Sequence, residues 1–213
     1  MRFNLVFLLL IAFAVSSFAQ VDNEHFKLKN EGNAAYRNKE YQKALDTYEE
    51  ALKVWPPDEI MDAQMIYLVA DCARRLKDDE KALLYFSRSL ELEYNPDNSS
   101  LYMASALRAL NREDEMEMLL LKSVERFQEG AALVQMKKML VTHYMKKGAE
   151  HFNRASEILK TAAGAKPEQY DEITKRANDS FSEAKPWFEK VLEIESENED
   201  AAKRIAEINN RIK

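Results

Sequence analysis

The side chains that could carry out chemistry in this chain are three histidines, one cysteine and many carboxylates. His143 and His151 are eight positions apart, which on a helix places them near one face but two turns from each other. They could share a metal ion only if another helix brought ligands between them, so we expect structural roles for them and for His25. Cys72 falls in the middle of an expected helix, and we predict that it is buried as a small hydrophobic residue.

The sequence lacks the short motifs of nucleotide binding and metalloprotease chemistry. GxGxxG, GxxxxGK[ST] and HExxH are absent, and one cysteine cannot form a CxxC pair. Acidic residues are numerous, but their spacing is that of solvated helix surfaces. An enzyme would need a buried carboxylate or histidine in a deep pocket, which the sequence does not indicate. We therefore predict no catalytic residues, no metal, no cofactor and a protein that is not an enzyme.

The elements that must position any functional side chains are predicted to be helices. Glycine (4) and proline (5) are scarce in the 213 residues, and β-branched residues form no alternating runs. The formal net charge is −6 with both signs interspersed, which argues against nucleic acid and anionic membrane as main partners. An all-α protein is the class most compatible with this composition.

Residues 1–19 have the layout of a secretory signal peptide. Arg2 gives a positive start, "LVFLLLIAFAV" is the apolar run, and Ser17 and Ala19 precede a cleavage site that would leave Gln20 as the new N-terminus. An uncleaved anchor is the alternative, although a spanning helix needs about 20 apolar residues. No other long apolar run occurs, so we expect no membrane insertion of the mature chain. With one thiol, an exported chain must be stabilised by packing rather than by internal disulfides.

An internal repeat emerges from the spacing of small and large residues. Ala44, Ala82 and Met116 recur along the chain at nearly equal intervals. Four positions after each of them comes a large apolar residue: Tyr48, Phe86 and Leu120. Seven positions after each comes a small residue: Ala51, Ser89 and Ser123. Twelve positions before each comes another small residue: Gly32, Ala70 and Ala104.

This pattern resembles the tetratricopeptide repeat, a helix–turn–helix unit of about 34 residues. The resemblance extends to a closing proline, Pro56, in the first copy. The third copy departs most, because Met116 and Leu120 replace the usual alanine and aromatic residue, and Tyr94 and Gln128 stand where closing prolines are expected. The resemblance implies a helical-repeat solenoid with three units over residues 20–130, at about 25–58, 59–96 and 97–130.

The repeat explains why small residues alternate with rings in the first copy. The two helices of a unit cross closely, so we expect Gly32 and Ala44 at the crossing and the rings of Tyr41 and Tyr48 beside it. A leucine at Gly32 or Ala44 should destabilise the fold by about 1–3 kcal/mol through overpacking.

Residues 131–213 are predicted to form an enlarged fourth hairpin and a capping helix. Residues 131–163 are helical, Gly164 and Pro167 interrupt the helix, and a second long helix carries Pro186, which is expected to kink it. In the alternative, the first helix splits at Met145–Gly148. Similar enlarged units occur in exported bacterial proteins of the family that the repeat resembles. The last segment is amphipathic, with its apolar face formed by Ala201, Ile205, Ile208 and Ile212.

The resemblance also implies a concave groove lined by the first helix of each unit. Carrying the family's groove positions over residue by residue gives polar, basic and aromatic candidates that suit an extended peptide or an acidic segment. They are Lys29, Asn33, Tyr36, Arg37, Tyr67, Asp71, Arg74, Arg75, Leu101, Ser105 and Arg108. The family's five-residue clamp for chaperone C-termini is rejected, because Lys29 and Asn33 match it but Leu68, Asn98 and Tyr102 do not.

The sequence therefore favours an exported, non-catalytic scaffold that binds a protein or peptide in this groove. We expect a periplasmic or envelope-associated location in a Gram-negative bacterium, with secretion less favoured. The alternative is a structural or assembly subunit of an envelope complex that uses the long C-terminal hairpin. The partner, the pathway and the oligomeric state are left open by the sequence.

Overall fold

The computed structural model describes residues 24–212, and every regular element among them is a helix. The predicted all-α, tetratricopeptide-like architecture is confirmed, with helices that pack in successive pairs. The predicted signal peptide at residues 1–19 lies outside the described residues. The chain divides into a first unit that ends at Ser123 and a second that begins at Val124, and each is described by itself.

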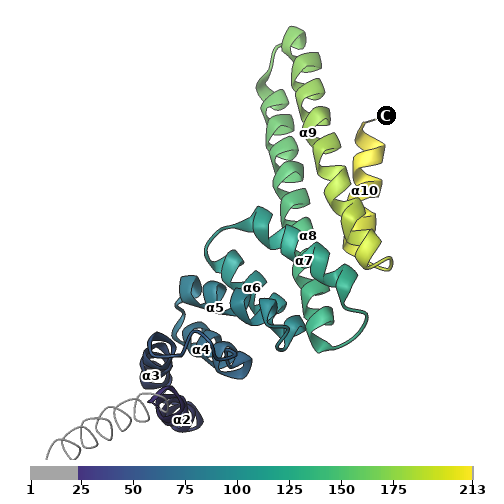
Figure 1. The fold of residues 1–213 in the computed structure, drawn as a ribbon. Coiled ribbons are helices and arrows are strands. Elements are labelled where there is room, and N and C mark those ends of the chain that lie inside the picture. Colours follow the sequence, from purple (N-terminus) through teal and green to yellow (C-terminus); the bar gives the residue numbers. More distant parts are fainter. Residues whose placement is uncertain (1–23, 213) are drawn as a thin grey trace, which may run out of the picture. The chain divides into compact units, whose positions relative to one another are not determined.

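The first unit is a stack of short helices in which consecutive elements lie side by side (Figure 1). Helix α2 packs against α3, α3 against α4, α4 against α5, and α5 against α6. The helices are α2 (Glu24–Arg37), α3 (Tyr41–Lys53), α4 (Ala63–Leu76), α5 (Asp79–Glu91), α6 (Pro96–Ala109) and α7 (Glu113–Arg126), the last turn of which lies beyond Ser123. α2, α4 and α6 are the first helices of the three repeats.

The predicted small positions lie in the packed interior of this unit. Gly32 is buried, and Ala70 and Ala104 have no exposed surface. The ring of Tyr48 on α3 lies directly over Gly32, since a Cβ built on Gly32 would be 2.6 Å from two of the ring's carbons. The small residues therefore allow the paired helices to approach, as the repeat pattern predicts.

The turn between the two helices of each repeat has the same geometry three times. Lys39, Lys77 and Asn111 have φ values of 62°, 61° and 57°, in the left-handed region. In each copy the residue after them donates its backbone N–H to a carbonyl five positions earlier, as in a Schellman motif. These bonds run from Glu40 to Ala35 (3.0 Å), from Asp78 to Ala73 (2.9 Å) and from Arg112 to Leu107 (2.9 Å). The turn thus keeps the repeat register without a glycine.

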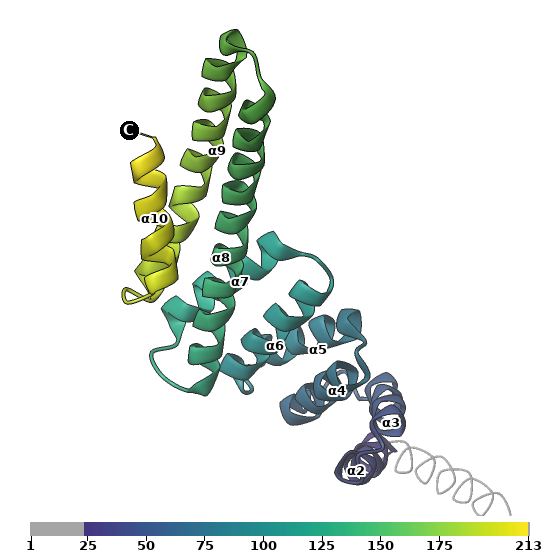
Figure 2. The ribbon, with the colours of Figure 1, turned by 180° about the vertical axis from the view of Figure 1, so that it is seen from behind.

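The second unit is a long helical hairpin with one further helix (Figures 1 and 2). It contains α8 (Ala131–Lys160), the short 3₁₀ helix η1 (Thr161–Gly164), α9 (Pro167–Ile194) and α10 (Glu199–Arg211). α8 runs without a break through Met145–Gly148, so the alternative of two shorter helices is wrong. α9 likewise continues through Pro186.

The hairpin contains a contact between a glycine and an aromatic ring like the one in the first unit. Phe188 on α9 lies over Gly148 on α8, and a Cβ at Gly148 would be 2.8 Å from two carbons of its ring. α10 packs against α9 and buries Ala201 and Ile208. Two arginines of α10 also lie over rings of the hairpin, Arg204 over Phe152 (4.6 Å to the centroid) and Arg211 over Phe181 (5.2 Å).

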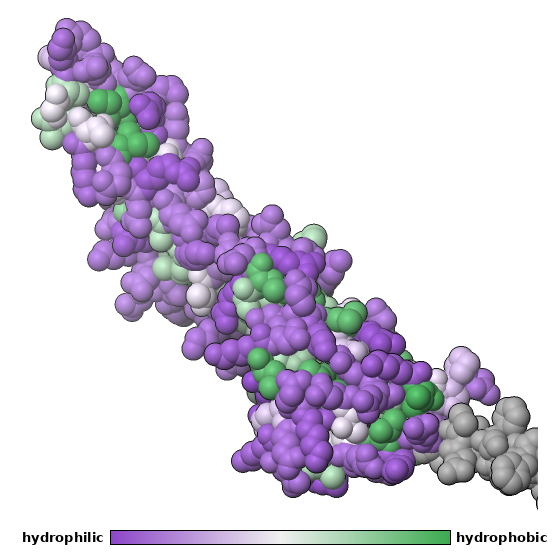
Figure 3. Space-filling view, turned by 90° about the vertical axis from the view of Figure 1, so that its left-hand side faces the viewer, coloured by the Kyte–Doolittle hydropathy of each residue, from purple (hydrophilic) through white to green (hydrophobic). Residues whose placement is uncertain are grey.

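The surface seen in Figure 3 is mostly hydrophilic, with hydrophobic side chains gathered in separate patches. Within residues 24–212, no helix is both long enough and apolar enough to cross a membrane.

Candidate protein-binding groove

A buried carboxylate of the first unit, Asp71 on α4, is 4% exposed and accepts several hydrogen bonds. Its Oδ1 accepts hydrogen bonds from Nε and Nη2 of Arg74, at 2.9 and 2.6 Å. Its Oδ2 accepts from Nε of Arg75 at 2.6 Å and from the Tyr36 hydroxyl on α2 at 2.6 Å. One carboxylate thus ties the first helices of the first two repeats together and positions two guanidinium groups.

Two aromatic rings support the guanidinium groups of Arg74 and Arg75. Arg74 lies over the ring of Tyr102 on α6 at 4.5 Å, and Arg75 lies over the ring of Tyr41 at the start of α3 at 4.8 Å. Such contacts hold a guanidinium plane in place while leaving its outer N–H groups available. We call the six residues the Asp71 cluster: Tyr36, Tyr41, Asp71, Arg74, Arg75 and Tyr102.

The electrostatics of the cluster favour an anionic ligand. Burial by itself would raise the pKa of Asp71, but the hydrogen bonds from Arg75, Tyr36 and Arg74 outweigh it and hold that pKa below its ordinary value. Asp71 is therefore ionised at neutral pH and balances only one of the two guanidinium charges. The side chains of Arg74 and Arg75 are 33% and 40% exposed, so the remaining positive charge faces outward.

Tyr36 and Tyr67 are half-buried tyrosines in the same region. Burial, followed by the hydrogen bond to Asp71, raises the pKa of Tyr36 to about 12. Burial raises the pKa of Tyr67 to about 12, and the neighbouring Tyr102 and Asp71 act in the same direction. The Tyr67 ring makes edge contacts with Phe86 (5.5 Å) and Tyr94 (5.7 Å). Both hydroxyls thus remain protonated and can donate hydrogen bonds at physiological pH.

Two predicted groove residues are engaged in structural contacts instead. Lys29 is bonded to Asp62, the residue that caps α4 by accepting a hydrogen bond from the Met65 N–H at 2.8 Å. The Asn33 side-chain oxygen accepts the hydroxyl proton of the buried Tyr48 at 2.7 Å. These contacts help to fix the packing of α2, and both side chains remain partly exposed.

The remaining predicted groove residues are Arg37, Leu101, Ser105 and Arg108. Arg37 and Arg108 are exposed at the last turns of α2 and α6. Leu101 is half-buried, and the Ser105 hydroxyl donates to the Leu101 carbonyl of its own helix at 3.0 Å. The structure therefore brings together Tyr36, Asp71, Arg74 and Arg75, with Tyr67 beside them.

Tyr41 and Tyr102 belong to the cluster but were not among the predicted groove residues. Tyr41 begins a second helix, so a rule restricted to first helices omits it. Tyr102 stands one position after the predicted Leu101. A search for aromatic residues in the repeats on either side of the Arg74–Arg75 dipeptide could have found both, because an arginine commonly lies over an aromatic ring.

The other reactive side chains have structural surroundings. Burial raises the pKa of the Cys72 thiol to about 12, and the predicted burial of this residue is confirmed. His25 lies 3.0 Å from a Glu59 carboxylate oxygen, and His151 lies 3.0 Å from one of Glu183. Among the described residues, no three His, Cys, Asp or Glu side chains converge as metal ligands would.

Comparison with known families identifies the repeat. Residues 26–92 match the family described as "Tetratricopeptide repeat". This segment covers the first two repeats and the Asp71–Arg75 part of the cluster. Residues 26–92 are therefore tetratricopeptide repeats, and proteins built from these repeats are typically non-catalytic scaffolds that often mediate protein–protein interactions.

One curated protein matches part of the chain in sequence. The chain is 33% identical over 89 residues to Protein PHOX3 of Arabidopsis thaliana, a match that covers 41% of this chain and 11% of PHOX3. The chain thus spans a small part of the length of that relative.

Two bacterial structures show the same fold along most of the chain. One is a tetratricopeptide repeat protein of Bacteroides fragilis, with a TM-score of 0.55, 19% identity and coverage of 88% of this chain and 99% of that one. The other is a candidate protein-binding protein of Bacteroides ovatus, with a TM-score of 0.50, 13% identity and coverage of 88% and 97%. At these identities the likeness concerns the fold alone.

Proposed function

We propose that the first three repeats bind a peptide or protein segment along α2, α4 and α6, with the Asp71 cluster at the centre of the binding surface. The single observation that carries this proposal is the pair of half-exposed guanidiniums, Arg74 and Arg75, held by one buried carboxylate and backed by two tyrosine rings. A rigid arginine–tyrosine group that becomes covered on binding is the kind of anchor that dominates recognition energetics.

The ligand we propose carries a carboxylate next to an apolar or aromatic residue. The carboxylate would pair with the outer N–H groups of Arg74 or Arg75, which can accept a forked anionic partner. The neighbouring apolar group would pack on Tyr36, Tyr67 or Tyr102. Since Asp71 already fixes the arginines, little side-chain entropy is lost on binding.

The test is a peptide-display selection on the purified chain, followed by affinity measurements with the selected peptides. We expect enrichment of Asp, Glu or a free C-terminus beside an apolar residue, and affinity that falls with added salt. Arg74→Lys and Arg75→Lys keep the charge but remove the planar fork, and together should weaken binding roughly tenfold. Arg88→Lys on α5 is the matched control. Equal binding by the paired lysine variant and the wild type would refute the proposed groove.

We also propose that the chain is exported to a bacterial envelope. This rests on the layout of residues 1–19 in the sequence. Fractionation of the producing cells and mass spectrometry of the protein test it. A periplasmic species that begins at Gln20 supports export with cleavage, whereas a cytoplasmic species that retains Met1 refutes it.

A further inference from the structure

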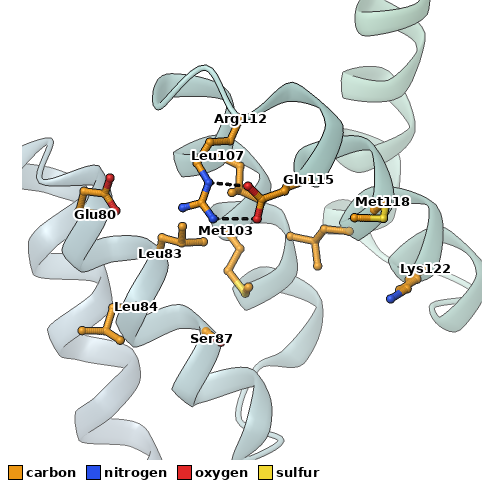
Figure 4. Close-up of a pocket in the computed structure, with 11 residues that line it drawn as sticks. Glu80, Leu83, Leu84, Ser87, Met103, Leu107, Arg112, Glu115, Met118 and Lys122 are labelled. Carbon is orange, nitrogen blue, oxygen red and sulfur yellow. Dashed lines mark hydrogen bonds and ion pairs between the residues drawn. The ribbon is translucent and has the colours of Figure 1, made fainter.

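A second hollow in the first unit lies between the second helices of repeats two and three. Helices α5 and α7 form its walls and α6 its floor, and it encloses about 540 Å³ (Figure 4). Leu83, Met103, Leu107 and Leu119 supply its apolar lining. On α6, Met103 and Leu107 are on the side away from the groove candidates Leu101, Ser105 and Arg108, because these two sets are offset by about half a turn. We call this hollow the α5–α7 cleft.

At the corresponding place between repeats one and two, a polar bridge joins the two second helices. Glu49 on α3 pairs with Lys81 of α5 at 2.8 Å and accepts a hydrogen bond from the Tyr85 hydroxyl at 3.3 Å. In the repeat register, Glu49 corresponds to Ser87, Lys81 to Glu115 and Tyr85 to Leu119. Ser87 is too short to span the gap and Leu119 has no polar atom, so the third repeat cannot form this bridge. The cleft is open because the bridging residues are replaced.

The outward residues beside the cleft are apolar without a packing reason. Leu84 and Met118, which are 55% and 58% exposed, occupy the same repeat position as the exposed Asp46 of the first repeat. Since the fold accepts a carboxylate at this position in α3, it does not require a large apolar side chain there. Exposed apolar residues that flank an apolar hollow are typical of a surface that becomes covered.

The charges at the rim indicate what covers it. Arg112 and Glu115 form a two-bond pair, with both distances 2.7 Å, so their charges cancel (Figure 4). The other charged lining residues are Glu80 on the α5 wall and Lys122 on the α7 wall, on opposite sides of the apolar centre. A face with an apolar middle and opposite charges on its two sides is complementary to itself. In a two-fold contact, each residue i that meets a residue j is matched by j meeting i.

We infer that the α5–α7 cleft is the contact surface for a second copy of this chain. Glu80 of one copy pairs with Lys122 of the other, and the symmetric pair forms on the opposite side. Leu84 and Met118 of both copies cover the two clefts. On α6 the contact uses Met103 and Leu107, whereas the proposed peptide groove uses Leu101, Ser105 and Arg108, so the two surfaces use different residues of that helix.

Charge reversal in the intact chain tests this inference. Sedimentation equilibrium over a range of concentrations should show a monomer–dimer equilibrium. Glu80→Lys alone and Lys122→Glu alone each place like charges together twice per dimer and should weaken the dimer roughly tenfold or more. The double variant Glu80→Lys with Lys122→Glu should restore the wild-type dissociation constant to within about threefold.

Two further variants separate the cleft from general surface effects. Leu84→Asp installs the residue type of the first repeat and should abolish the dimer, while the melting temperature measured at concentrations where the wild type is monomeric stays unchanged. Leu76→Asp, at a 37% exposed leucine on α4 that does not line the cleft, should leave the dimer intact. A chain that stays monomeric at every concentration overturns the inference. So does a dimer that survives Leu84→Asp, or one that the double charge reversal fails to restore.

Discussion

Gly148 and Phe188 stand in the same relationship as Gly32 and Tyr48, although they belong to a much longer hairpin. In both pairs a ring of the second helix rests on a glycine of the first, at 2.8 and 2.6 Å from an added Cβ. The chain between Gly148 and Phe188 is nevertheless far longer than the chain between Gly32 and Tyr48. The long hairpin is therefore a repeat unit extended around its turn, since the contact that sets the helix crossing is retained.

Alanine at either glycine should destabilise its own hairpin. The added methyl group meets a ring of a buried aromatic residue that has no free space to move into, so we expect a loss of about 1–3 kcal/mol in the free energy of unfolding. Urea denaturation of Gly32→Ala and Gly148→Ala measures this. Gly164→Ala is the matched control, because no atom lies within 4 Å of its added Cβ. Unchanged stability in the first two variants would mean that the rings do not rest on these glycines.

Glycine at the left-handed turn positions should stabilise the protein. Lys39 and Lys77 hold φ near +60°, a conformation that is about 1–2 kcal/mol unfavourable for a residue with a Cβ. Glycine would remove this cost from the folded state, but its greater chain entropy in the unfolded state offsets part of the stabilisation. We therefore expect Lys77→Gly to raise the free energy of unfolding by about 0.5–1 kcal/mol. Chemical denaturation measures this change. Lys53→Gly, near the end of α3 in a right-handed helix, should instead destabilise, and an identical effect of both changes would contradict the turn geometry.

Asp71 should make the stability of the first unit depend on pH in the acid range. Its folded pKa is lower than its unfolded value of 3.8, so its contribution is fully present well above pH 3.8 and is lost as the pH falls through the folded pKa. Asp71→Asn should destabilise the protein at pH 7 by about 1–3 kcal/mol, because the arginines and Tyr36 lose an ionised acceptor. The variant should also show a shallower loss of stability below pH 4.

Denaturation between pH 2.5 and 7 tests that linkage. Asp171→Asn, at an exposed position on α9, serves as the control and should reproduce the wild-type pH dependence. If the free energies of unfolding of Asp71→Asn and the wild type fall in parallel as the pH is lowered, the hydrogen bonds of the Asp71 carboxylate do not lower its pKa.

Tyr36 and Tyr67 should titrate late in the alkaline range. The folded pKa of each is raised from 10.0 to about 12, so the protonated form is favoured by folding. The stabilisation is complete below pH 10 and declines as the pH rises toward 12. In absorbance titrations of phenolate formation, Tyr36→Phe and Tyr67→Phe should each remove one late-titrating group. Tyr170→Phe, at a 56% exposed ring, is the control and should leave the late titration of Tyr36 and Tyr67 unchanged.

The spacing of small and large residues was sufficient to predict the helices, the repeat and its packed glycine and alanines, because these depend on local periodicity and on volume at a close crossing. The face that Tyr36, Arg74 and Arg75 occupy could be predicted for the same reason, since the repeat position of a residue determines which face of its helix it occupies; their role in a groove stays a prediction. The sequence could not show that Lys29 and Asn33 are engaged with Asp62 and Tyr48, because those bonds join residues of different helices.

Three features required the tertiary structure. The sequence placed Asp71 at a groove position, but only the fold brings two arginines and a tyrosine onto its buried carboxylate and sets Tyr41 and Tyr102 against the guanidiniums. Continuous helix through Met145–Gly148 was open in the sequence because Gly148 is a poor helix former in isolation, whereas packing beneath Phe188 requires a glycine there. The α5–α7 cleft exists because Ser87 cannot reach α7. Composition and period determine which residues form helices and which face is buried, but distances between side chains of different helices arise only when the helices pack.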